Sequence, residues 1–506
     1  MIDGKILIEK LLRYSEDFLH LSKRDEIYFR NLLLREFNLT EPNEKEIDLS
    51  EIDSLDVPDT LVSDIENFAR ENNLCLEGEE NLYSTYIMGL LSPLPSKVNE
   101  EFVKIKNSEG IRKACDYFYN LSVKNNYVQK TAISKNILWT FNDNEKYLEI
   151  TINLSKPEKN NKDIAKLLSA SRTTNHSACL LCKENEGFKG NVKHPARENI
   201  RTISVNLDGE KWFVQYSPYA YFNEHLIAIN EEHKPMVVND GTIRKLADFV
   251  DIFPNYMIGS NAALPIVGGS ILNHEHYQGG GHLMPMHNAK IKAYFTALKH
   301  KKVKVGIVDW YNSVIRLESK NRSEIINLAS EIVSAWANYT DSDLGIFSET
   351  DGVLHNTLAP VCRKTGKTYI YDLILRNNIT SEEYPDGVFH AHPEYHNIKK
   401  EGIGLIEAMG LYILPGRLKK QLAEISDILV GNNKVDIEEL SKEEHPLYVH
   451  RNMIKELLKD GVVSTKEEAD KKIRDKVNNV CKNILLNTAV FKKDEKGEQG
   501  FIKFLN

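Results

Sequence analysis

The sequence predicts an α+β protein with two mostly antiparallel sheet units and flanking helices, a helical N-terminal region and a helical C-terminal appendage. Three observations support this fold class. Apolar residues repeat at helical spacing over the first 130 residues, alternate with polar residues in the middle of the chain, and return to helical patterns after residue 402. We therefore expect a helical region at 1–130, a catalytic sheet domain at 131–300, and a second sheet unit with a helical extension at 301–506.

The composition is that of a globular protein. The 506 residues are 41% hydrophobic and 27% charged, and no apolar run is long enough to cross a bilayer. A net charge of −8 argues against a general nucleic-acid-binding surface, and six cysteines argue against a secreted disulfide scaffold. The N-terminus carries no leader pattern. We expect a cytoplasmic protein with neither nucleic acid nor membrane as a partner.

The elements of the first sheet unit follow from local patterns. Alternation over 148–154 predicts a strand, and Ser155 with Glu158 forms a capping-box pattern that predicts a helix reaching Leu168. Segment 201–230 has the pattern of two strands joined by an Asp208-Gly209 turn. A helix is expected near 243–253.

The second unit repeats this arrangement. Strands are predicted at 307–310 and 313–317, a helix at 323–339, and a hairpin that turns at 365–367 into a strand at 369–375. The pair His390 and His392 then repeats the spacing of His274 and His276. This repetition favours a duplicated, diverged unit, although chance would also produce one such pair. The Lys- and Glu-rich helices beyond residue 402 are interpreted as a solvated appendage.

The glycine-rich segment 268–282 is the strongest functional candidate. In extended backbone, His274, His276 and Gln278 share one face, whereas a helix would point His276 away from the other two. Flanking glycines, Gly269 among them, let the main chain approach a ligand closely. Two imidazoles and an amide beside exposed backbone N–H groups favour a phosphate-handling site with a histidine nucleophile. The alternative is a strand with two structural histidines beside a Gly-rich turn.

The chemistry divides the roles of His276 and Gln278. A neutral imidazole can attack phosphorus and pass the group to a second acceptor, provided that the other ring nitrogen holds the proton. The carbonyl of Asn273 or a nearby backbone oxygen could accept that proton's hydrogen bond. An amide at Gln278 can bind a phosphoryl oxygen but cannot supply a proton as histidine would. The pattern therefore favours transfer between phosphates.

Cysteine and histidine spacing indicates a structural zinc site. Cys179 and Cys182 have the spacing of a metal knuckle, and His225 and His274 complete a four-coordinate set, with His233 as the competing fourth ligand. A reduced thiol pair and a redox pair are the alternatives.

A second constellation is formed by His355, His390 and His392. They could bind another divalent metal, with Glu394 or His282 completing the shell, could contact a sugar phosphate, or could be polar residues at a domain junction. Four nearby cations could neutralise phosphate charge, with solvated surface as the alternative role for each. They are Arg316, Arg363, Lys364 and Arg376.

The sequence from His274 to Gln278 resembles the active-site signature of galactose-1-phosphate uridylyltransferases, the transferase branch of the histidine-triad superfamily. Segments 88–96, 148–159 and 268–280 resemble the second, Firmicute-type class of that family, and the similarity runs over nearly the whole chain. Two features depart from the better-known class. Glu275 stands where that class has proline, and that class lacks the long helical N-terminal region.

The resemblance implies histidine-triad-like sheet units and a ping-pong reaction. His276 would take UMP from UDP-glucose, releasing glucose 1-phosphate, and galactose 1-phosphate would accept UMP to give UDP-galactose. Gln278 would bind the transferred phosphoryl group. Asn261 and Ser270 would contact the nucleotide phosphates. Apart from the resemblance, we expect Gly269 and Arg316 to bind substrate as well. Two metal sites are implied. They are Cys179, Cys182, His225 and His274 for zinc, and His355, His390 and His392 for a second divalent metal.

Two other functions stay open at this point. A dinucleoside polyphosphate phosphorylase or nucleotidyl hydrolase of the same superfamily could use the same histidines, and a metal-stabilised nucleotide-binding protein would need no catalysis. UDP-hexose and hexose 1-phosphate are the expected small-molecule partners. The hexose preference, the metal identity and the oligomeric state, for which a homodimer is one option, do not follow from the sequence.

Overall fold

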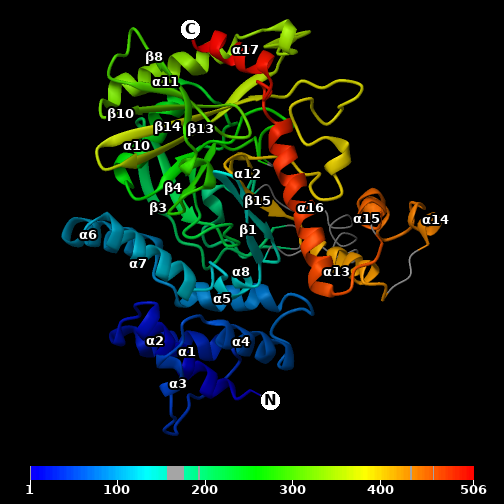
Figure 1. Cartoon of the computed structure of the whole chain (residues 1–506). Helices are drawn as coiled ribbons and strands as arrows, with labels where there is room; N and C mark the ends of the chain where they lie inside the picture. The colour runs from blue at the N-terminus through cyan, green and yellow to red at the C-terminus, as the bar shows by residue number, and fades with distance from the viewer. Residues whose placement is uncertain (1, 156–175, 192–193, 270, 433–435, 460) are drawn as a thin grey trace. The chain divides into compact units, whose positions relative to one another are not determined.

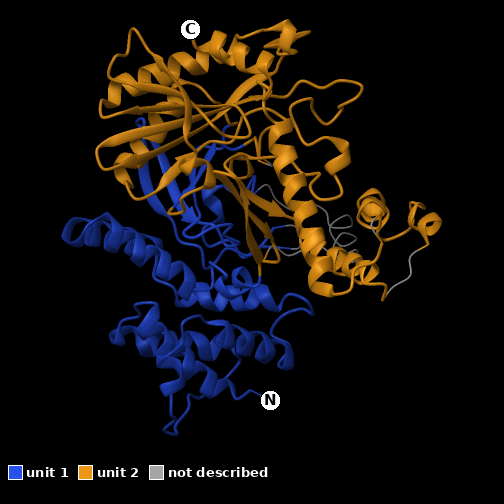
Figure 2. Ribbon diagram, viewed as in Figure 1, with its two compact units in different colours: residues 1–135, 157–234, 274–280 blue, residues 136–156, 235–273, 281–506 orange. Residues whose placement is uncertain are grey.

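The computed structural model describes residues 2–155, 176–191, 194–269, 271–432, 436–459 and 461–506. The chain divides into two compact units, each assembled from segments that are distant in sequence (Figure 2). Unit 1 comprises residues 1–135, 157–234 and 274–280, and unit 2 comprises 136–156, 235–273 and 281–506. The helix predicted after Ser155 lies outside the described residues. The domain boundaries expected near 130 and 300 stay predictions.

The first part of unit 1 is helical, as predicted (Figure 1). The first helix begins where the Asp3 side chain accepts hydrogen bonds from two backbone N–H groups, and its apolar stripe, which includes Leu7 and Leu11, is buried. The helices are α1 (Gly4–Phe18), α2 (Glu26–Glu36), α3 (Ser50–Asp53), α4 (Asp59–Glu71), α5 (Glu80–Leu91), α6 (Pro95–Glu109), α7 (Ile111–Lys124) and α8 (Lys130–Ser134).

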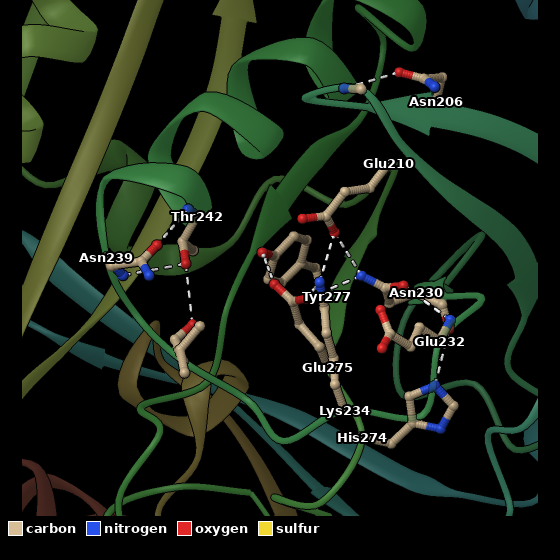
Figure 3. Close-up of polar contacts among 12 residues, drawn as sticks. Asn206, Glu210, Asn230, Glu232, Lys234, Asn239, Thr242, His274, Glu275 and Tyr277 are labelled. Carbon is tan, nitrogen blue, oxygen red and sulfur yellow. Dashed lines mark hydrogen bonds and ion pairs between the residues drawn. The ribbon is translucent and has the colours of Figure 1, made fainter.

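An antiparallel sheet follows in unit 1, in the order β3, β4, β5, β7. The predicted turn is confirmed, because Asp208 and Gly209 both have positive φ, as a two-residue hairpin between right-twisted strands requires. The Gly209 N–H donates to the Asn206 side chain, a contact drawn in Figure 3. The strands are β3 (Ile203–Leu207), β4 (Glu210–Tyr216), β5 (Leu226–Asn230) and β7 (His276–Gly280).

Unit 2 contains a longer antiparallel run in the order β6, β13, β14, β10, β9, β8. Its predicted helices are present, and the first begins at a capping box formed by Asn239 and Thr242. The α+β fold class is therefore confirmed in both units. The elements are α10 (Asp240–Ile252), β6 (Met257–Gly259), β8 (Ile291–Thr296), β9 (Lys304–Val308), β10 (Val314–Ser319), α11 (Arg322–Ala337), β13 (Asn356–Thr365) and β14 (Thr368–Asn377).

Two smaller sheets complete unit 2. In the first, β1 (Ile137–Asp143) and β2 (Lys146–Ile152) are antiparallel, and β15 (Leu411–Leu414) pairs in parallel with β2. The second is a two-stranded pair of β11 (Glu349–Thr350) and β12 (Val353–Leu354). Within the described ranges, no helix has both the length and the apolar character needed to cross a bilayer.

The C-terminal region differs from the solvated appendage predicted for it. It is largely helical, but it contributes β15 to a sheet, and α16 buries Ile473, Val477 and Ile484. These residues recur at helical spacing within a Lys- and Glu-rich sequence, so the charge content concealed an apolar stripe. The helices are α12 (Leu405–Ala408), α13 (Leu418–Leu429), α14 (Ile437–Leu440), α15 (Arg451–Leu457), α16 (Lys466–Asn487) and α17 (Glu495–Leu505).

A buried ion cluster lies within the sheet of unit 2. Arg316 on β10 pairs across strands with Asp372 on β14, and the Arg316 Nε donates to Asp372 Oδ1 at 2.6 Å. Arg316 also donates to backbone carbonyls of Met286 and Ala289. Arg363 donates to the other Asp372 oxygen. Burial alone would raise the pKa of Asp372, but the two guanidinium groups outweigh it and lower the pKa to about 2.

Replacing Asp372 by Asn should destabilise unit 2 and make its free energy of unfolding less dependent on pH in the acid range. The folded-state pKa lies below the ordinary aspartate value, so this carboxylate contributes stability above about pH 4, and the contribution is lost as the pH falls toward 2. The neutral amide leaves the buried guanidinium charges of Arg316 and Arg363 unpaired, which lowers the free energy of unfolding by about 3–5 kcal/mol at pH 7. Chemical denaturation at pH 7 and at about pH 3 measures both effects.

The matched control is Asp475→Asn on the exposed face of α16. It should change neither the free energy of unfolding nor its pH dependence. An Asp372→Asn protein as stable as this control at pH 7 would contradict the structural role of the cluster.

Candidate active site and metal centre

The strand β7 presents the predicted histidine and glutamine on one face. His276 and Gln278 alternate with Tyr277, which is fully buried on the opposite face and stacks on Trp212 with ring centroids 4.7 Å apart. The extended conformation predicted for this segment is confirmed from His276 onward. His274 precedes the strand, so it belongs to the turn that leads into it.

His276 is held in one tautomer by the main chain. Its Nδ1 lies 2.8 Å from the carbonyl oxygen of His274, so the Nδ1–H donates there and Nε2 keeps its lone pair. The predicted proton-holding oxygen is therefore that of His274. Burial lowers the pKa of His276, which is only 6% exposed, and the ring is neutral at pH 7. A neutral imidazole with a free Nε2 is a competent nucleophile for phosphorus.

Gln278 contacts a residue that was predicted to belong to the zinc site. His225, predicted as a zinc ligand, places its Nε2 3.2 Å from the Gln278 Oε1. This corrects the ligand set, because the antiparallel register of β5 and β7 puts His225 beside Gln278 and away from His274.

Four ligand atoms gather around the predicted cysteine pair. The side chains of Cys179, Cys182, His233 and His274 each offer one ligand atom, and all four atoms lie within 4.8 Å of one another. The Cys182 Sγ lies 3.1 Å from the His233 Nδ1, 3.6 Å from the Cys179 Sγ and 3.9 Å from the His274 Nδ1. His233, the competing ligand, therefore takes the position expected for His225.

This arrangement fits a tetrahedral metal ion. With zinc bonds of about 2.3 Å to sulfur and 2.0–2.1 Å to nitrogen, the ligand atoms of a tetrahedron lie about 3.3–3.8 Å apart, close to the three separations measured from the Cys182 Sγ. His274 also has the outer-shell contact typical of a ligand, since its Nε2 lies 2.9 Å from the Asn230 carbonyl oxygen. Both sulfur atoms belong to free cysteines.

The second predicted metal site is not formed. Among the described residues, the cluster above is the only group of three or more candidate ligands, and His355, His390 and His392 do not converge. Each ring contacts a different partner: His355 contacts the Asn378 side chain, His390 accepts from the Ile403 N–H, and His392 contacts the Val388 carbonyl. His282, a candidate to complete the shell, instead contacts Glu149 at 2.7 Å.

Glu275, the residue between the two histidines, is fully buried in a polar network (Figure 3). Its carboxylate accepts hydrogen bonds from the Tyr277 hydroxyl at 2.8 Å and from the Asn230 side chain at 3.0 Å, and it lies 3.5 Å from the Lys234 ammonium. Glu210 accepts from both Asn230 and Lys234. Because Asn230 also contacts His274 through its carbonyl, this network fixes the backbone on both sides of His276.

The remaining predicted substrate-binding residues lie in unit 2. The Asn261 side chain accepts from the Leu405 N–H at 2.9 Å, and a Cβ on Gly269 would lie 2.9 Å from the Asn261 side-chain nitrogen, so a larger residue at 269 would displace the Asn261 amide. Ser270 lies outside the described residues. The prediction that Arg316 binds substrate is corrected, because its guanidinium is paired with Asp372 in the ion cluster.

The structure also gives partners to the other predicted cations. Arg363 shares Asp372 with Arg316, and Lys364 pairs with Asp251 at 2.8 Å. Arg376 is buried and donates to the Ile403 carbonyl. Arg316 and Arg376 are therefore buried, and the alternative role of solvated surface is wrong for both.

Sequence reasoning missed Asn230, Tyr277 and Lys234 as supports of the site. Asn230 ends a strand whose other residues are apolar, and a polar residue at such a position signals a specific partner. The other two carry no comparable local signal.

A neutral, buried imidazole with an unprotonated ring nitrogen, on the same strand face as a carboxamide, is the arrangement that a histidine-dependent phosphoryl- or nucleotidyl-transfer enzyme requires. Family models described as galactose-1-phosphate uridyl transferase, N-terminal domain, and galactose-1-phosphate uridyl transferase, C-terminal domain, match residues 38–235 and 249–445. The chain belongs to the galactose-1-phosphate uridyl transferase family.

Curated relatives named galactose-1-phosphate uridylyltransferase match over nearly full length. The protein of Caldanaerobacter subterraneus is 46% identical over 99% of this chain and 98% of its own, and that of Clostridium acetobutylicum is 42% identical over 99% of both. The protein of Lactococcus lactis is 44% identical over 95% and 94%. Among solved structures, a yeast Ap4A phosphorylase matches 65% of this chain and 89% of its own at 11% identity, with a TM-score of 0.34, too low to compare the two sites.

Proposed function

We propose that the protein transfers UMP from UDP-glucose to galactose 1-phosphate through a covalent uridylyl group on His276. Family membership and nearly full-length relatives that carry the name of this activity support the reaction. The observation that carries the choice of nucleophile is the hydrogen bond from His276 Nδ1–H to the His274 carbonyl, which leaves Nε2 free to attack.

In the first half-reaction, the Nε2 lone pair attacks the α-phosphorus of UDP-glucose. An N–P bond forms, the P–O bond to glucose 1-phosphate breaks, and the electron pair leaves on a phosphate oxygen that needs no proton at neutral pH. The Nδ1 proton stays hydrogen-bonded to the His274 carbonyl and stabilises the positive charge of the uridylylated ring. Galactose 1-phosphate reverses these steps with its own phosphate oxygen. One phosphoanhydride replaces another, so the reaction is freely reversible.

Gln278 supplies a hydrogen-bond donor to the transferred phosphoryl group. Its side-chain oxygen contacts His225, so its NH₂ group is the end available to an anionic oxygen. Asn261 and Ser270 are proposed to bind the nucleotide phosphates, as the resemblance implies, and Gly269 is proposed as a further substrate-binding residue. UDP-hexose and hexose 1-phosphate are the proposed partners, and the cytoplasm the proposed location.

Cys179, Cys182, His233 and His274 are the residues that would hold a structural zinc ion. When bound, zinc would supply a rigid cross-link between the cysteine loop and the segment that leads into β7, and no reaction step passes through it. Its contribution is orientation, because His274 provides both a ligand nitrogen and the carbonyl that fixes His276.

Intact-mass measurement after mixing with UDP-glucose tests the proposal. A transferase gains one uridylyl group and stops, and added galactose 1-phosphate removes the group as UDP-galactose. Steady liberation of UMP from UDP-glucose alone would instead identify a hydrolase, and reversible binding without an adduct would identify a nucleotide-binding protein. Either outcome overturns the proposal.

A further inference from the structure

His225 is buried beside Gln278 and takes no part in the metal cluster. It directly precedes β5, is 2% exposed, and is flanked by aromatic rings, with centroid distances of 5.3 Å to Tyr221 and 4.5 Å to Phe222. A polar ring buried among aromatic side chains needs a specific hydrogen bond to offset its desolvation. The contact with the Gln278 Oε1 provides it.

Two contacts define the tautomer of His225. Burial lowers its pKa to about 4, against the opposing effect of the bond to Gln278, so the ring is neutral and carries one proton. The Tyr221 N–H points to Nδ1 across a long 3.5 Å contact, which makes Nδ1 the acceptor. The proton is therefore on Nε2, and the Nε2–H donates to the Gln278 Oε1 at 3.2 Å.

This hydrogen bond decides which end of the amide is free. The oxygen and the NH₂ of a carboxamide are nearly equal in size, so without a partner the group can turn either way. Turned the wrong way, it would present an oxygen to an anionic phosphoryl group and repel it. His276 and Gln278 share one face of β7 and are two residues, about 7 Å, apart along the strand.

We infer that His225 is a positioning residue that fixes the Gln278 amide with its NH₂ toward the phosphoryl group carried by His276. The inference rests on the proposed function, because Gln278 is given its role there. His225 touches neither substrate nor metal in this scheme. Replacing His225 should therefore lower the rate of uridylyl transfer and should leave the metal content unchanged.

The first test compares two substitutions of His225. His225→Phe keeps a planar ring and removes the donor, whereas His225→Gln carries an amide N–H about as far from the backbone as the imidazole Nε2. We expect His225→Phe to lower kcat of UDP-glucose/glucose 1-phosphate exchange by roughly 10- to 100-fold, the value of one hydrogen bond to a charged group, with KM little changed. His225→Gln should recover most of that loss. Equal losses in the two variants would overturn the inference.

The second test is a double-mutant cycle with Gln278→Ala. If His225 acts through Gln278, His225→Phe should cause no further loss of kcat in the Gln278→Ala background. The same loss in both backgrounds would overturn the inference, as would a loss accompanied by reduced metal content. His225→Leu replaces His225→Phe in the cycle where the larger ring lowers the yield of folded protein. Failure of the proposed function is distinguishable, because the unaltered protein would then show no exchange at all.

Discussion

His276→Ala should abolish exchange of label between UDP-glucose and glucose 1-phosphate in the absence of galactose 1-phosphate. The exchange requires a covalent uridylyl intermediate, and alanine offers no atom that can form one. Removing a nucleophile of this kind lowers kcat by far more than loss of a hydrogen bond, here by more than roughly 10⁴-fold. The variant should also gain no mass on mixing with UDP-glucose.

Folding of the variant is checked separately from activity. His276 is not one of the four residues of the candidate metal cluster, so the metal content of His276→Ala should match that of the unaltered protein. His445→Ala, a partly exposed histidine in the C-terminal region, serves as the control and should keep full exchange. Exchange retained in His276→Ala would remove this residue from the mechanism.

Cys182→Ser should lose the metal ion that the cluster is proposed to hold, and it should destabilise unit 1. Cys182 has the most contacts in the cluster, because its Sγ lies within 3.1–3.9 Å of the other three ligand atoms. The metal-binding energy of a structural site is part of the folding energy, so loss of the ion should lower the free energy of unfolding by about 4–5 kcal/mol. Metal analysis and chemical denaturation measure the two effects.

Cys75→Ser provides a matched cysteine control. Cys75 belongs to the same unit but lies outside the cluster, and its replacement should leave metal content and stability unchanged. A chelator should reproduce the Cys182→Ser effect in the unaltered protein. Purified protein that contains no metal and gains no stability from added zinc would contradict the structural role.

The sequence predicted those elements whose signals are local. The alternation in β2, the Asp208-Gly209 turn and the helix at α10 each depend on residues within a few positions of one another. The same holds for His276 and Gln278, because period two in a strand is enough to place them on one face.

The errors arose where the answer depended on strand register. In the antiparallel pair of β5 and β7, Ile229 lies opposite His276 and Ile227 lies opposite Gln278. Residues before β5 therefore approach Gln278, and residues after it approach His274. For this reason His225 contacts the Gln278 amide, whereas His233 joins the candidate metal cluster. Arg316 is a similar case, since its cross-strand neighbour is Asp372. Spacing along one strand carries no information about its partner.

The four candidate metal ligands come from two stretches of chain, one ending at residue 234 and the other beginning at 274, and residues 235–273 between them belong to the other unit. Strand β7 lies in the later stretch, and it pairs with β5 in the earlier one. During synthesis from the N-terminus, the pairing of strands β3, β4, β5 and β7 in unit 1 cannot be completed until residue 280 has left the ribosome. His276 is therefore among the last residues to join its own unit, so a nascent chain that stops short of this point exposes an unpaired β5 edge.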